Sequence, residues 1–127
     1  MNTDVGLVGE ENISRSVIGA AIRVANALGV GFLEKVYENA LALELRLAGH
    51  QVEQQRCVDV RYRGEIVGVY QVDLLVDSTL VVELKAVEAL APVHKAQCLN
   101  YLRATGLRIG LLINFGRPHV EVRRILS

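Results

Sequence analysis

Residues 66–87 have the sequence IVGVYQVDLLVDSTLVVELKAV, and this stretch decides the fold. Residues 66–76 and 80–87 are rich in β-branched side chains, which favour extended strands. Asp77, Ser78 and Thr79 lie between the two segments and suit a short hairpin loop. We therefore expect two antiparallel strands joined by these loop residues.

Two carboxylates lie inside these apolar strands. If the loop is residues 77–79, paired residues have numbers that sum to 156, which places Asp73 opposite Glu83 and Gln71 opposite Lys85. Because side chains alternate with a period of two, Glu83 and Lys85 share one face of their strand. Burying a carboxylate costs several kcal/mol unless a cation, a metal or a hydrogen-bond donor compensates it, so each acid implies a partner.

Two carboxylates and an ammonium group are therefore expected to converge. Such oxygen ligands can hold Mg²⁺ or Mn²⁺, and a nearby lysine can orient or deprotonate a water for phosphodiester hydrolysis. The alternative is a buried salt-bridge network of Asp73, Glu83 and Lys85. Two acids against one base leave a negative charge uncompensated, and this favours the metal.

The sequence before the hairpin predicts two helices and a strand. Apolar residues recur at helical spacing over residues 12–28 and 33–48, and glycines follow each segment. Alternating side chains over residues 52–62 predict a strand. The residues expected on one face of this strand are Val52, Val58, Val60 and Tyr62.

The sequence after the hairpin predicts a helix and one or two strands. Pro92 suits the first turn of a helix that continues to Ala104 and ends at Gly106. Residues 107–115 form an almost unbroken apolar run, which is typical of a strand covered on both faces, and residues 119–126 can add an edge strand. We therefore expect an α/β fold with a mixed sheet.

Length and composition indicate one folded domain over residues 1–127. The chain has a mass of 13.9 kDa and is 51% apolar, which can support a single core. No uncharged run reaches the roughly 18 residues of a membrane span, and the N-terminus lacks a signal-peptide pattern, so we expect a cytoplasmic protein with no membrane partner. Cys57 and Cys98 are then expected to be free thiols. The scattered histidines argue against a zinc site.

The charges are distributed unevenly although the net charge is zero. Residues 1–93 carry 8 Lys and Arg against 13 Asp and Glu, whereas residues 94–127 carry 6 against 1. Either the two segments intermix in space and the asymmetry vanishes, or a basic face lies beside an acidic pocket that attracts cations.

Asp73 followed by Glu83-Leu84-Lys85 in a hairpin resembles the signature of the PD-(D/E)XK nucleases, although Val72 stands where that signature has proline. The order of helices and strands also resembles their restriction-endonuclease-like core. Residues 31–37, GFLEKVY, have the G-x-x-E-x-x-Y pattern of the GxxExxY family of small proteins, which is assigned to the same superfamily. The likeness covers residues 13–115.

The resemblance implies a metal site and a nuclease activity. Asp73, Glu83 and the backbone carbonyl of Leu84 would hold Mg²⁺ or Mn²⁺, with Lys85 acting on the water. Glu34 matches the helical acid that many such nucleases place beside the metal. These residues would form the catalytic site for nucleic acid, whether DNA or RNA.

A second element of the resemblance lies in the helix after the hairpin. Gln97 and Tyr101 are one turn apart and resemble the Q-x-x-x-Y element, whose glutamine supports the catalytic site and contacts nucleic acid. Other residues nearby have ordinary structural interpretations. Tyr37 is expected in the core with its hydroxyl in a hydrogen bond. Glu44 is expected to form a hydrogen bond with an arginine or with the backbone. His94 is expected to be a solvent-exposed residue near the start of a helix.

Two functions from different classes follow from these residues. One is a metal-dependent nuclease, and the alternative is a binding or assembly module that keeps the fold with a weak or inactive site. A core of this size leaves little surface for gripping a polymer, so we expect a homodimer or a partner protein. The expected dimer contact is the edge strand at residues 119–126 or the apolar face of the first helix.

Overall fold

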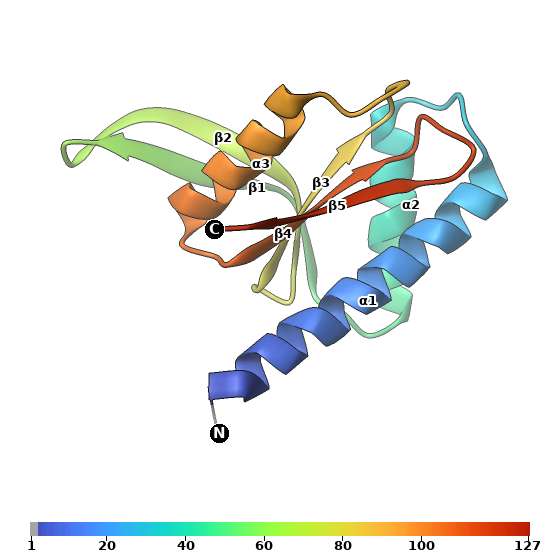
Figure 1. The fold of residues 1–127 in the computed structure, drawn as a ribbon, viewed down its shortest axis with the longest axis horizontal. Coiled ribbons are helices and arrows are strands. Elements are labelled where there is room, and N and C mark those ends of the chain that lie inside the picture. The colour runs from blue at the N-terminus through green and yellow to red at the C-terminus, as the bar shows by residue number, and fades with distance from the viewer. Residues whose placement is uncertain (1–2) are drawn as a thin grey trace.

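The computed structural model describes residues 3–127, which form three helices and a five-stranded mixed sheet (Figure 1). The elements are α1 (Thr3–Leu28), α2 (Glu34–Leu47), β1 (Val52–Tyr62), β2 (Glu65–Val76), β3 (Leu80–Lys85), α3 (Pro92–Thr105), β4 (Ile109–Asn114) and β5 (Glu121–Leu126). The strand order is β1-β2-β3-β4-β5, and only β3 and β4 are parallel. The α/β class and the order of elements are as expected, although α1 begins well before the predicted start at Asn12.

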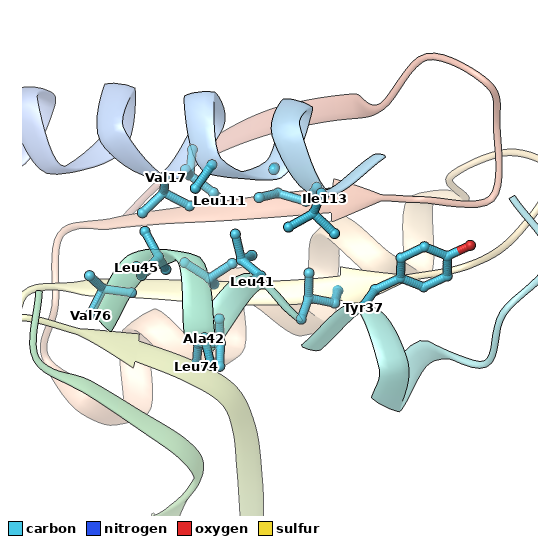
Figure 2. Packing of buried hydrophobic residues seen from close by; sticks show 14 of the residues in the cluster. Val17, Tyr37, Leu41, Ala42, Leu45, Leu74, Val76, Leu111 and Ile113 are labelled. Atoms are coloured by element: carbon cyan, nitrogen blue, oxygen red, sulfur yellow. The ribbon is translucent and has the colours of Figure 1, made fainter. Parts of the chain in front are cut away.

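The helices cover the two faces of the sheet unequally. We call the side covered by α1 and α2 the α1–α2 face and the side covered by α3 the α3 face (Figure 1). Figure 2 shows Val17 of α1 and Leu41 and Leu45 of α2 packed on Leu111 and Ile113 of β4. The apolar side chains of α1 from Val17 to Val24 that pack on the sheet are therefore buried within the chain, so the prediction that this face of the helix offers a dimer contact is wrong.

The turn between β2 and β3 is the predicted one. Val76 pairs with Leu80 and Leu74 pairs with Val82, which is the expected register. The ladder ends at Leu74, however, because β2 then leaves β3 and continues beside β1 alone. Gln71 pairs with Cys57 of β1, so its predicted position opposite Lys85 is wrong.

Strand β1 changes face at Gln55. Val52 packs against the core of the α1–α2 face, whereas Val58 lies in the core of the α3 face. The prediction that Val52 and Val58 share a face is therefore wrong. Gln55 has a φ of 53°, and neither it nor Asp73 takes part in the β1–β2 register, so the alternation is interrupted at this point in both strands.

The distal part of the β1–β2 hairpin, residues 57–71, projects beyond the body of the sheet (Figure 1). We call this segment the arm. Its large apolar side chains are mostly exposed: Tyr62, Ile66, Val67, Val69 and Tyr70.

No helix within residues 3–127 has both the length and the apolar character needed to cross a membrane.

Candidate active site

Asp73 and Glu83 are joined where β2 separates from β3. The backbone N–H of Asp73 donates to Oε1 of Glu83 at 3.0 Å, and the N–H of Leu84 donates to Oδ2 of Asp73 at 2.8 Å. Side-chain carboxylates thus accept these two backbone N–H groups just beyond the last pair of the β2–β3 ladder. One hydrogen bond joins the two acids directly and the other joins Asp73 to the residue after Glu83, although no ladder pair joins Asp73 and Glu83.

Strand β3 directs its charged residues to the α3 face. Val82 and Leu84 lie in the core of the α1–α2 face, while Val81 lies in the other core. The alternation of a strand then places Glu83 and Lys85 on the α3 face. Among the described residues Lys85 forms no ion pair with either acid, so the structure lacks the alternative salt-bridge network.

Glu83 is a carboxyl group in a nearly dry position, and among the described residues it forms no ion pair. It is 7% exposed, and burial raises its pKa to about 8, with the negative charge of Asp73 adding to the increase. The hydrogen bond from the backbone of Asp73 and the charge of Lys85 oppose this increase only in part. Without another cation, Glu83 therefore favours the protonated form near neutral pH.

Glu34 is the first residue of α2 and lies within electrostatic reach of the acids. Partial burial raises its pKa most, and the charges of Asp73 and Glu38 raise it further. Lys85 and His94 lower it. Glu34 is nevertheless an exposed residue, and among the described residues it forms no hydrogen bond with Asp73 or Glu83.

Gln97 and Tyr101 lie on α3 beside the arm. They line a cavity of about 70 Å³ together with Tyr70 and Asn100, and the rings of Tyr70 and Tyr101 are 5.6 Å apart. Burial raises the pKa of Tyr101, and the charges of Glu83 and Asp73 raise it further. The hydroxyl of Tyr101 therefore interacts electrostatically with both acids. Gln97 is exposed and, within the described chain, forms no hydrogen bond with the acidic pair.

Residues 11–125 match the PD-(D/E)XK nuclease superfamily. The chain belongs to this superfamily. Among solved structures, an alkaline exonuclease (LHK-Exo) from Laribacter hongkongensis matches with a TM-score of 0.50 and 16% identity over 84% of this chain and 76% of the exonuclease chain. SSO0001 matches with a TM-score of 0.47 and 18% identity over 100% of this chain and 78% of that one. No curated protein sequence matches the chain.

This superfamily member has a buried polar network that the sequence analysis missed. Glu38 is 3% exposed, and it accepts hydrogen bonds from Lys35 at 2.8 Å, Gln54 at 2.7 Å and Gln55 at 2.6 Å. The amide of Gln55 also donates to Oδ1 of Asp73 at 3.2 Å. The signal was the polar sequence at residues 54–56, which interrupts the alternation of β1.

Asn114 fixes the chain that leaves β3 directly after Lys85. It is fully buried, and its side chain bonds the N–H of Val87 at 3.0 Å, the carbonyl of Val87 at 2.9 Å and the N–H of Gly116 at 2.9 Å. A Cβ on Gly116 would lie 2.1 Å from the carbonyl oxygen of Val87. A lone asparagine in the apolar run of residues 107–115 was the available signal.

Tyr37 and Glu44 have the structural roles expected of them, whereas His94 is half-buried and not exposed as predicted. The hydroxyl of Tyr37 donates to the carbonyl of Gly29 at 2.6 Å, and its ring stacks on Phe115. Glu44 accepts from Arg23 at 2.8 Å. His94 accepts from the N–H of Ala91 through Nδ1 at 3.0 Å and so caps the start of α3. Both cysteines are free, as predicted.

The donor set at the acidic pair fits a hard divalent cation. Within the described part of the chain, no three Asp, Glu, His or Cys side chains lie close enough to hold an ion by themselves. Two carboxylates and a backbone carbonyl are oxygen donors, which Mg²⁺ and Mn²⁺ prefer, and Mg²⁺ usually completes its shell with water and substrate phosphate. Burial raises the pKa of Glu83 most and the charge of Asp73 raises it further, and a bound cation would favour the ionised form against both.

Proposed function

We propose that the chain is a Mg²⁺- or Mn²⁺-dependent nuclease that hydrolyses phosphodiester bonds of DNA or RNA. Asp73, Glu83 and the carbonyl of Leu84 would hold the ion, with Glu34 as a further oxygen ligand. The observation that carries this proposal is the pair of hydrogen bonds from the N–H of Asp73 to Glu83 and from the N–H of Leu84 to Asp73, which holds two carboxyl groups together at the end of β3. Membership of the nuclease superfamily supports it.

The residues of the chain would divide the remaining work. A bound divalent cation supplies Lewis-acid stabilisation of the phosphate and lowers the pKa of water. Lys85 lies on the same face as Glu83 and, among the residues that the structure describes, pairs with neither acid, so its ammonium group would orient the attacking water or stabilise developing charge. Gln97 would support the site, and Gln97 and Tyr101 would contact the nucleic acid.

We also propose the narrower assignment to the GxxExxY family. Gly31 has a φ of 108°, a conformation that glycine adopts without strain. Glu34 follows at the start of α2, and the hydroxyl of Tyr37 accepts from the N–H of Phe32 at 3.2 Å. Each residue of the motif thus has a role in the turn that brings Glu34 toward the acids.

Metal titration tests the proposed nuclease directly. Calorimetry should detect Mn²⁺ binding to the wild-type chain and its loss in Asp73→Asn, and cleavage of single-stranded, double-stranded or branched substrates should depend on the ion. A wild-type chain that binds nucleic acid but neither binds Mn²⁺ nor cleaves any substrate would overturn the proposal. That result would favour the alternative, a binding module with an inactive site.

We further propose a two-fold homodimer formed through the arm. The arm exposes apolar side chains on a two-stranded ribbon, which is marginally stable without a covering partner. Its Arg61 and Arg63 are balanced by Asp59 and Glu65, which suits a second copy better than a phosphate backbone. Light scattering should give a dimer mass that Val67→Lys reduces to a monomer.

The free edge of β5 offers a second surface, and a substitution there serves as the comparison. Leu126→Lys changes an exposed residue of that strand and should leave the dimer intact. A monomer mass for the wild-type chain across the micromolar range would contradict the dimer, and dissociation by Leu126→Lys alone would move the contact to β5.

A further inference from the structure

Gln55 occupies a backbone conformation that a strand residue rarely adopts. Its φ of 53° lies in the left-handed region, which costs a residue other than glycine roughly 1 kcal/mol or more. The consequence is that β1 changes face here and that the side chain of Gln55 lies between Glu38 and Asp73. Strain beside a candidate active site calls for a functional explanation.

The surroundings of Gln55 determine how its amide is oriented. Its Nε2 donates to Oε1 of Glu38 at 2.6 Å and to Oδ1 of Asp73 at 3.2 Å. An ionised carboxylate only accepts hydrogen bonds, so the NH₂ end of the amide must face both acids. Glu38 lies on α2, and its other oxygen, Oε2, accepts from Lys35 at 2.8 Å, so this ion pair holds the anchor of the amide even where Gln54 is replaced.

We propose that Gln55, anchored by Glu38, is the positioning residue for Asp73. It holds Oδ1 while the N–H of Leu84 holds Oδ2, so both oxygens have a fixed direction and each keeps a lone pair for a cation. This inference rests on the proposed function, because it assigns Asp73 to the cation. Without the amide of Gln55, only the hydrogen bond from the N–H of Leu84 would hold the carboxylate of Asp73 among the contacts of the described chain.

The variant Gln55→Gly tests the role of the side-chain amide without disturbing the backbone conformation of residue 55. Glycine adopts a positive φ without cost, so the fold and the change of face should persist while the amide is lost. Loss of a partner that orients a ligand typically weakens metal binding about 10- to 100-fold. We expect the Kd for Mn²⁺ to rise by about tenfold or more, with little loss of stability against urea.

The chain provides a matched control in the neighbouring residue. Gln54 donates to the same Glu38 carboxylate and to Asn39 at 2.8 Å, but it does not reach Asp73. Gln54→Ala should therefore leave the Kd for Mn²⁺ unchanged.

Gln55→Asn is the second test variant, because asparagine tolerates positive φ and its shorter side chain cannot span both acids. Its Mn²⁺ affinity should also fall.

The experiment is calorimetric titration of Mn²⁺ into the wild-type chain and these variants, followed by cleavage assays over a range of Mn²⁺ concentrations. A positioning role predicts that excess Mn²⁺ restores much of the rate in Gln55→Gly. Equal Mn²⁺ affinity in the wild-type chain and in folded Gln55→Gly or Gln55→Asn would overturn the inference and leave the nuclease proposal standing. Equal weakening by Gln54→Ala would also overturn it. Absence of Mn²⁺ binding to the wild-type chain would overturn both proposals.

Discussion

The two faces of the sheet are built for different purposes. The cluster on the α1–α2 face contains seventeen buried residues of the described chain, whereas the cluster on the α3 face contains four. Glu83 and Lys85 lie on the thinner side. We call the α1–α2 face, which has the larger cluster, the thick face, and the α3 face the thin face. Since buried apolar area supplies most of the stability of a domain, burial on the thick face can offset the cost of holding charged residues on the thin face. The comparison predicts that activity and stability can be removed separately.

The largest expected effect is the loss of cleavage in Lys85→Ala. Within residues 3–127 Lys85 forms no ion pair with the acids, so its removal should leave the fold and the affinity for Mn²⁺ largely intact. Cleavage should fall by about 10²- to 10⁴-fold, as is typical when one charged or proton-transferring group is removed. Lys95→Ala changes an exposed lysine of α3 and is the control. Unfolding of Lys85→Ala would instead indicate a structural salt bridge.

A substitution on the thick face should have the opposite result. Leu41→Ala removes a fully buried side chain of α2 and should lower the free energy of unfolding by about 2–5 kcal/mol. Under conditions in which the variant stays folded, the Kd for Mn²⁺ should match that of the wild-type chain. Leu43→Ala lies on the same helix with 58% exposure and should change stability by less than about 0.5 kcal/mol. Equal effects from both leucines would contradict the comparison.

The sequence was sufficient to predict the features set by local patterns. The loop at residues 77–79 and the pairing of Leu74 with Val82 follow from alternation on each side of a short turn. Strand β4 is buried along its whole length, as its apolar run indicated. Asp73 and Glu83 could be identified because charge inside an apolar strand requires compensation.

The missed features depend on contacts between distant segments. The positive φ of Gln55 is not a preference of glutamine, and it persists where Glu38 and Asp73 hold the amide from two other elements. Because that conformation changes the face of β1, strict alternation placed Val52 and Val58 together wrongly. No pattern within residues 52–62 contains this information.

The third prediction concerns the dependence of stability on pH, because burial of Glu83 on the thin face disfavours its ionised form. Its pKa in the folded chain is about 8, above the ordinary value of 4.5, so folding stabilises the protonated form. This contribution is complete below pH 4.5 and is lost as the pH rises through about 8. The metal-free chain should therefore lose stability over this range, by up to about 1.4 kcal/mol per pH unit.

Urea unfolding in EDTA at several pH values measures this effect. Glu83→Gln cannot titrate, so its stability should vary less over the same range, and Mn²⁺ should restore the wild-type chain most strongly at high pH. A wild-type chain whose stability relative to Glu83→Gln rises with pH would contradict the assignment of the raised pKa to Glu83.

The smallest expected effect concerns Tyr37, which lies in the core of the α1–α2 face and holds the turn before α2. Tyr37 stacks on Phe115 with ring centroids 4.8 Å apart, while its hydroxyl bonds the backbone of Gly29 and Phe32. Tyr37→Phe keeps the ring and its burial but leaves two backbone groups without this partner, so the free energy of unfolding should fall by about 1 kcal/mol.

The turn held by Tyr37 leads directly to Glu34, which links this small change to the acids on the other face. Tyr37→Phe should therefore weaken Mn²⁺ binding slightly, by about twofold, which corresponds to roughly 0.4 kcal/mol. Tyr62→Phe is the control, because Tyr62 is 66% exposed on the arm and should alter neither quantity. If Tyr37→Phe lowers stability without changing Mn²⁺ affinity, the turn serves the thick core alone and Glu34 is not a ligand. If both change together, the turn couples the apolar face to the charged one.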